Sequence, residues 1–207
     1  MRSSLTALLV AGVALGASPA ASMAAQGQTP VQTVKGGILD EINLYTRTPP
    51  SATIVVIRPF SATDADIVDG DKKDETKKMQ EVAPRMLAEE FVAKLKEMKA
   101  FADVSVLEVA GAPAGSLVVE GKFTEMDPGS RAKRYFVGFG SGKSGVTAKG
   151  SVKAADGTLL ATFIQRRIGV MGVAGGDSMK KLEGDTKNIG EDLAKFLSAW
   201  ATGKKLK

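Results

Sequence analysis

The chain has 207 residues, contains neither cysteine nor histidine, and carries a formal net charge of +5. Without cysteine it has no disulfide, no thiolate metal site and no lipid-modified cysteine, and without histidine it lacks the usual general base at neutral pH. Hydrolytic chemistry would have to rest on carboxylates or lysines, and we expect no cofactor and no metal. The modest positive charge favours anionic surfaces without specifying one.

Residues 1–25 have the layout of a secretory signal peptide. Arg2 precedes an apolar run over residues 5–15, and small residues follow as far as Ala25. The apolar run is shorter than the about 20 residues that a membrane-spanning helix needs. We therefore expect cleavage after Ala24 or Ala25, a periplasmic or secreted protein, and no transmembrane helix after cleavage. The remaining length suits one domain with a real core.

Residues 26–52 contain several glycines and prolines and predict an extended leader, much of it loosely ordered. The β-branched run 53–57 then predicts a buried strand. The acidic stretch 63–75 fails the spacing of a calcium loop, because Thr76 stands where that loop needs glutamate. Apolar residues at helical spacing follow as far as residue 98, and Pro84 predicts either the first turn of this helix or a kink within it.

Four further runs predict strands, over residues 104–109, 117–124, 145–153 and 158–168, with a hairpin turn at Asp156-Gly157. A last amphipathic helix begins near residue 178, and two glycines predict a weak point in it near residues 185–186. Trp200 is expected to anchor the core from this helix.

The order β-α-β-β-β-β-α predicts a single α+β domain over residues 53–201. Its fold is one mixed sheet of about five strands, with two main helices packed largely on one face. Residues 202–207 predict a solvated basic tail.

The stretch 126–145 is the candidate binding region. Its glycines lose more backbone entropy on ordering than other residues do, and its aromatic rings would expose apolar area if nothing covered them. The tentative binding residues are Arg131, Lys133, Arg134, Tyr135, Phe136, Phe139 and Lys143. We favour an external, partly acidic partner or self-association over a structural plug formed against the domain's own sheet.

Three other interpretations are weaker. Gly142-Lys143-Ser144 resembles the end of a nucleotide-binding P-loop, but Val137 stands where that motif needs glycine and a strand follows it. The basic and aromatic pattern resembles RNA-binding strands, but Tyr135 stands where that motif needs glycine, and export argues against nucleic acid as a partner. A carboxylate-dependent enzyme could use Glu120, Glu125 and Asp127. Alternation along a regular strand places the first two on opposite faces, which disfavours this hypothesis.

The sequence over residues 118–129, with residues 134–144 and the Asp156-Gly157 turn, resembles the bacterial "domain of unknown function 4410" family of secreted envelope proteins. The resemblance covers roughly residues 50–200. It implies a periplasmic or envelope location and a small domain similar to the periplasmic domain of the curli secretion channel. It brings no catalytic residues. We therefore expect a non-enzymatic binding or assembly module whose partner is an envelope protein, a second copy of the chain or an anionic envelope surface.

Overall fold

The computed structural model describes residues 28–52, 54–67, 73–108, 111–128, 144–169 and 178–207. Within these ranges the elements are, in chain order, β1 (Gln32–Lys35), β2 (Glu41–Leu44), β3 (Ile54–Ile57), β4 (Asp66–Ile67), α2 (Lys73–Met98), β5 (Asp103–Val106), β6 (Leu117–Asp127), β7 (Ser144–Ala154), β8 (Leu159–Gly169) and α4 (Ser178–Ala201).

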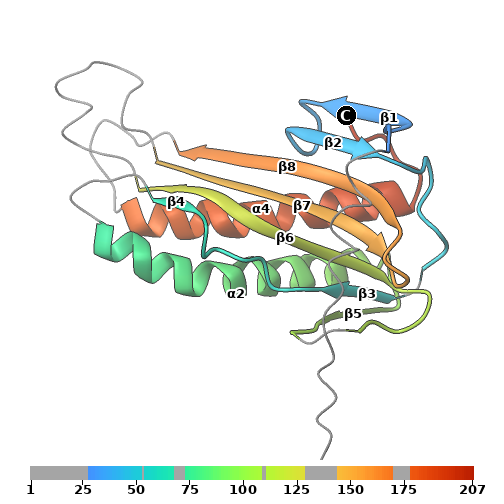
Figure 1. Cartoon of the computed structure of the whole chain (residues 1–207), viewed down its shortest axis with the longest axis horizontal. Helices are drawn as coiled ribbons and strands as arrows, with labels where there is room; N and C mark the ends of the chain where they lie inside the picture. Colours follow the sequence, from blue (N-terminus) through green and yellow to red (C-terminus); the bar gives the residue numbers. More distant parts are fainter. Residues whose placement is uncertain (1–27, 53, 68–72, 109–110, 129–143, 170–177) are drawn as a thin grey trace, which may run out of the picture.

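The strands form one mixed sheet in the order β1-β2-β8-β7-β6-β3-β5, and β4 pairs with β6 beside this row (Figure 1). Its centre is the antiparallel meander β6-β7-β8, in which each strand has 11 residues. The expected turn joins β7 to β8, with Gly157 at a φ of 90°, a conformation that glycine adopts without steric cost. The strand β3 runs parallel to both β5 and β6.

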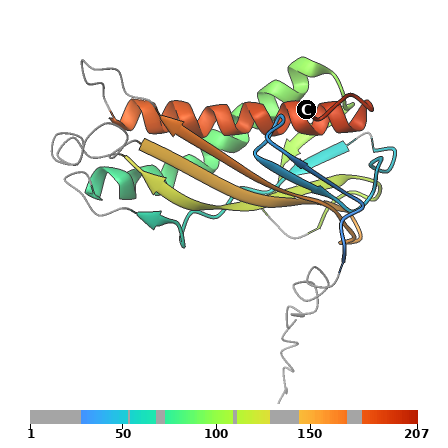
Figure 2. The same cartoon turned by 90° about the horizontal axis from the view of Figure 1, so that it is seen from above.

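Both helices cover one face of the sheet, and they lie side by side (Figure 2). Alternation along β6 directs Leu117, Val119 and Phe123 into this interface, where all three are buried. The other face of the sheet carries charged side chains, among them Glu120, Lys153 and Arg166. The expected α+β class, with one mixed sheet and two main helices, is therefore confirmed. Neither of the two helices in the described ranges is long and apolar enough to span a bilayer.

A series of aromatic rings connects the sheet to α4 through the core. Phe163 stacks 6.1 Å from Phe60 and lies 6.4 Å from Phe196, which in turn stacks on Trp200 at 5.8 Å. Such pairs contribute about 0.5–1.5 kcal/mol each beyond their buried area. Trp200 is 3% exposed and donates its indole N–H to the Arg47 carbonyl at 3.1 Å. The expected role of Trp200 as a core anchor is confirmed.

The sheet is larger than expected, with eight strands instead of about five, in the order β-β-β-β-α-β-β-β-β-α. Two of the additional strands, β1 and β2, lie within residues 26–52, which the sequence predicted to be a loosely ordered leader. Val34, Ile42 and Leu44 are buried, and β2 pairs with β8. Each strand has only four residues, too few for alternation to be recognised against the surrounding glycines and prolines.

Pro84 lies well inside α2, as in the second of the two expected alternatives, a longer helix that contains the proline. The helix α4 is more continuous than expected, since it runs without a break past residues 185–186. Gly190 has a packing role in α4, because a Cβ atom there would lie 2.8 Å from the Leu87 carbonyl oxygen of α2. The basic tail is only partly solvated, since Leu206 is buried and its carbonyl accepts a hydrogen bond from Ile38 N–H at 3.0 Å.

Candidate functional site

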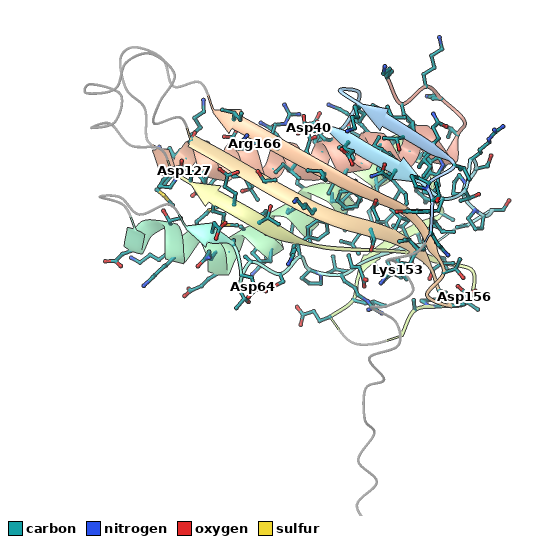
Figure 3. All side chains as sticks on the ribbon, turned by 45° about the horizontal axis from the view of Figure 1, so that its top comes forward. Asp40, Asp64, Asp127, Lys153, Asp156 and Arg166 are labelled. Carbon is teal, nitrogen blue, oxygen red and sulfur yellow. The ribbon has the colours of Figure 1, made fainter. Side chains whose placement is uncertain are left out.

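The predicted binding region, residues 126–145, connects the central strands β6 and β7. These strands remain paired as far as Asp127 and Gly145, so the connection leaves the sheet at one end (Figures 1 and 3). At its base, Met126 and Val146 lie opposite each other and are fully buried. The tentative binding residues themselves lie outside the described residues: Arg131, Lys133, Arg134, Tyr135, Phe136, Phe139 and Lys143.

The residues that resemble the end of a P-loop, Gly142-Lys143-Ser144, directly precede and begin β7. Ser144 is the first residue of β7, which continues as a strand to Ala154, while Gly142 and Lys143 lie outside the described residues. A P-loop joins a strand to a helix whose N-terminal amides face the phosphates. The expectation that this run leads into a strand is confirmed, and the polypeptide that follows Ser144 therefore lacks the helix that a P-loop needs.

On the outer, polar face of the sheet, Glu120 forms a three-residue ion cluster. Lys153 Nζ donates to its Oε1 at 2.5 Å, and Arg58 Nη1 donates to its Oε2 at 3.3 Å. The three side chains are only 25–37% exposed. Because each oxygen of Glu120 already accepts a hydrogen bond from a cation, this carboxylate is held as part of a structural ion pair.

The expected separation of Glu120 and Glu125 onto opposite faces is wrong. The register of β6 against β7 shifts between Phe123 and Glu125, so Glu120 lies opposite Ser151 and Glu125 lies opposite Thr147, on the same outer face. Alternation assumes a regular strand, and a β-bulge breaks it. Four residues of β7 still separate the two positions by about 13 Å. That distance exceeds the about 5–9.5 Å between paired catalytic carboxyl groups in glycoside hydrolases.

Glu125 and Asp127 lie closer together, two residues apart at the end of β6. However, both oxygens of Glu125 are occupied, one by the Thr147 hydroxyl at 2.9 Å and the other by Arg166 Nη2 at 3.4 Å. The carboxylates that sequence reasoning offered for catalysis are therefore tied into contacts with their neighbours on the sheet.

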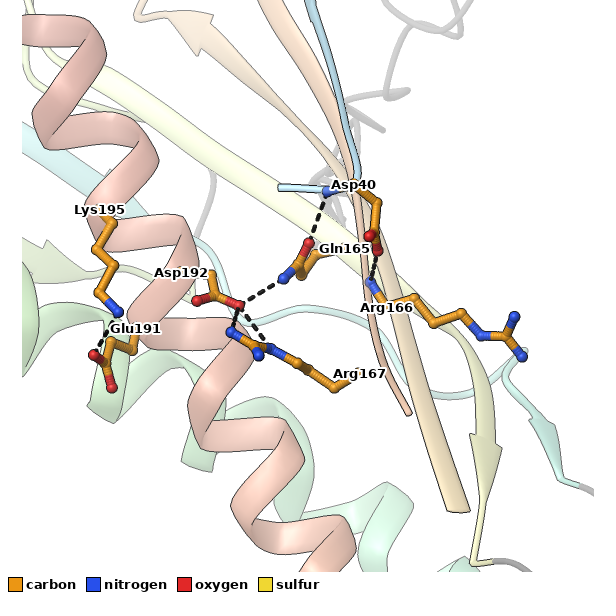
Figure 4. Close-up of polar contacts among 7 residues, drawn as sticks. All are labelled: Asp40, Gln165, Arg166, Arg167, Glu191, Asp192 and Lys195. Carbon is orange, nitrogen blue, oxygen red and sulfur yellow. Dashed lines mark hydrogen bonds and ion pairs between the residues drawn. The ribbon is translucent and has the colours of Figure 1, made fainter. Parts of the chain in front are cut away.

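A second polar cluster lies on the inner face, between β8 and α4 (Figure 4). Gln165 Nε2 donates to Asp192 Oδ2 at 2.6 Å, and Arg167 donates to the same oxygen through Nε at 2.8 Å and through Nη2. Gln165 is 5% exposed and Asp192 is 4% exposed. A buried carboxylate is costly unless it is paired and hydrogen-bonded, so these contacts fix the position of α4 against β8.

This cluster extends to the turn between β1 and β2 (Figure 4). Asp40 N–H donates to Gln165 Oε1 at 2.9 Å, and Arg166 N–H donates to Asp40 Oδ2 at 2.6 Å. Gln165 thereby joins the hairpin, the meander and α4. Sequence reasoning missed this residue, although the alternation from Ala161 through Phe163 places it on the inner face.

Asp185 is a second buried acid on α4, about two turns before Asp192. Burial raises the pKa of its carboxyl, and the charges of Lys181 and Arg167 oppose this shift. Its Oδ2 has no hydrogen-bond partner in the part of the chain that the structure describes. Within those same ranges, no group of three or more Asp, Glu, His or Cys side chains is arranged to hold a metal ion.

The family model "Domain of unknown function (DUF4410)" matches residues 55–173. The chain belongs to this family, as its resemblance indicated. No curated protein matches it.

Three solved structures are similar to the chain. The PelC dodecamer from Paraburkholderia phytofirmans has 14% identity and a TM-score of 0.41, over 74% of this chain and 96% of that chain. A leucine-to-methionine variant of the PelC dodecamer from the same organism has 14% identity and a TM-score of 0.39, over 74% of this chain and 95% of that chain. An uncharacterised protein has 10% identity and a TM-score of 0.40, over 73% and 96%. The curli secretion channel that the resemblance implied is not one of these three structures.

Proposed function

We propose that this protein is a non-enzymatic module of the bacterial periplasm or cell envelope that binds a partner protein, or a second copy of itself, through residues 126–145. The observation that carries the proposal is the position of this stretch. It connects two of the long central strands, and Met126 and Val146, which pair at the ends of these strands, are buried. Binding residues often lie on connecting segments that a rigid scaffold of regular elements positions.

The chemistry of the stretch supports an external partner. Three aromatic rings lie within residues 135–139, and four cations lie within residues 131–143. Aromatic and arginine side chains are enriched at protein interfaces, and the cations favour a partner with acidic groups. The alternative is that the stretch packs against its own sheet as a structural plug.

Two observations support a non-enzymatic role. The chain contains no histidine or cysteine, so the commonest general base and thiol nucleophile are both missing. Glu120 and Glu125, the carboxylates that an enzyme would need, are both engaged in ion pairs on the outer face of the sheet. The envelope location is supported by the signal-like layout of residues 1–25 and by the resemblance to secreted envelope proteins.

Affinity capture from native envelopes tests the proposal. The wild-type protein is compared with the double variant Phe139→Ser/Arg134→Glu and with the matched control Val82→Ser/Lys78→Glu. The control likewise replaces one apolar residue with serine and one cation with glutamate, on an exposed face of α2, where Val82 is 47% exposed. We expect the wild type and the control to capture the same partner and the first variant to lose it. Equal capture by all three proteins would contradict the proposal.

A further inference from the structure

A groove of about 660 Å³ lies between β1 and the end of the chain. The strand β1 and the chain end lie at the opposite end of the molecule from Asp127 (Figures 1 and 3). All four residues of β1 line one side of it, and residues 203–207 line the other. The largely buried side chains of Val34, Leu44 and Trp200 form an apolar base.

The groove is positively charged. None of the described residues that line it is acidic, and its cationic lining residues are Lys35, Arg47, Lys204, Lys205 and Lys207. Lys35 pairs with Glu41 at 3.3 Å and remains 72% exposed. In the described part of the chain, the other four cations have no ion-pair partner. The groove therefore suits a ligand that brings several negative charges.

The strand β1 also has an unpaired edge. It is the last strand of the described row and pairs only with β2. The chain end does not occupy this edge, because its backbone hydrogen bond goes to Ile38, beyond the end of β1. Unpaired main-chain N–H and C=O groups on an edge strand can accept an extended peptide as an additional strand.

We propose that this groove binds an extended acidic peptide segment of another protein, which pairs with β1 and places its carboxylates beside the lysines. The cations are spread over β1, the segment after β2 and the chain end. This spacing suits an extended chain with repeated charges better than a single small anion. The inference goes beyond the proposed function because it concerns the opposite end of the molecule, so either one can fail without the other.

Fluorescence anisotropy with the full-length protein tests this inference. The probe is a labelled peptide of about eight residues with alternating glutamate and valine. One comparison peptide carries an N-methyl group on every backbone amide, which blocks both of its edges for strand pairing, and another replaces every glutamate with lysine. We expect the first peptide to bind and each comparison peptide to bind at least about tenfold more weakly.

Two variants locate the binding. Lys204→Glu/Lys205→Glu should raise the Kd of the glutamate peptide about tenfold, since two attractions become repulsions. Lys77→Glu/Lys78→Glu, which makes the same charge change on exposed residues of α2, should leave the Kd unchanged. Equal binding of the N-methylated peptide would show attraction by charge alone and overturn strand pairing. Absence of binding, or equal loss in both variants, would overturn the site itself.

Discussion

Gln165 of β8 donates a 2.6 Å hydrogen bond to Asp192 of α4, and it accepts a 2.9 Å hydrogen bond from the backbone of Asp40 in the β1–β2 turn. One buried amide thus connects a helix, the centre of the sheet and the hairpin that forms one wall of the basic groove. The hairpin, the meander and α4 are therefore held together by specific polar contacts as well as by apolar packing.

The first prediction concerns Asp192. Replacing it with alanine removes the common acceptor of Gln165 and Arg167, and it leaves a buried amide without a partner. We expect the free energy of unfolding to fall by about 2 kcal/mol, less than for a fully buried pair because the Arg167 side chain is 40% exposed. Urea unfolding measures this loss. Glu191→Ala, which removes a more exposed pair with Lys195, should cost much less, and equal losses would contradict the prediction.

The second prediction concerns Asp185 and pH. Burial raises the pKa of this carboxyl above its ordinary value of 3.8, so the folded protein holds the proton more tightly than the unfolded chain does. Stability from the protonated form is therefore present at low pH and lost as pH rises from about 4 through the raised pKa. Urea unfolding of wild type and Asp185→Asn across this range should show the wild type losing stability relative to the variant. A difference that does not change with pH would contradict this.

The third prediction concerns Gly121, which lies opposite Gly150 at the centre of the meander. A Cβ atom at Gly121 would lie 2.5 Å from the Lys149 carbonyl oxygen and 2.6 Å from the Phe60 ring. Gly121→Ala should therefore lower stability by about 1–3 kcal/mol through overpacking. Gly145→Ala is the control, since its nearest neighbouring atom would be 3.6 Å away. Thermal unfolding distinguishes them, and similar melting temperatures for both variants would refute this account of the core.

The long strands and the helical regions could be predicted from the sequence because their apolar residues repeat over many positions. Val119 and Phe123 on β6 alternate with polar residues, and this places one face of the sheet against the helices. The bulge before Glu125 could not be predicted, because a one-residue register shift depends on how two strands pair and not on the period of either one.

The role of Gly190 also could not be predicted from the sequence, because it depends on how two helices pack together. Gly190 lowers intrinsic helix propensity, which predicted a weak α4, but the structure shows that it allows close contact with α2. The basic groove was missed because its cations are residues 35, 47, 204, 205 and 207, which converge only in the folded chain. The tentative residues of the 126–145 region stay a prediction, since they lie outside the described ranges.

The fourth prediction is export with loss of residues 1 to about 24. The short apolar run and the small residues after it favour cleavage over a retained anchor. Intact-mass measurement of the protein purified from a periplasmic fraction should give a chain that begins near residue 25. Detection of Met1 in that fraction would contradict cleavage.

The central claim is that residues 126–145 bind another molecule. The measurement that tests it most directly is the melting temperature and the molecular mass of Phe139→Ser/Arg134→Glu, recorded on the same samples together with the captured partner. If the stretch is a binding surface, the variant should lose its assembly while its melting temperature stays within about 2 °C of the wild type. A large fall in melting temperature, with molecular mass and captured partners unchanged, would show instead that the stretch is part of the protein's own core.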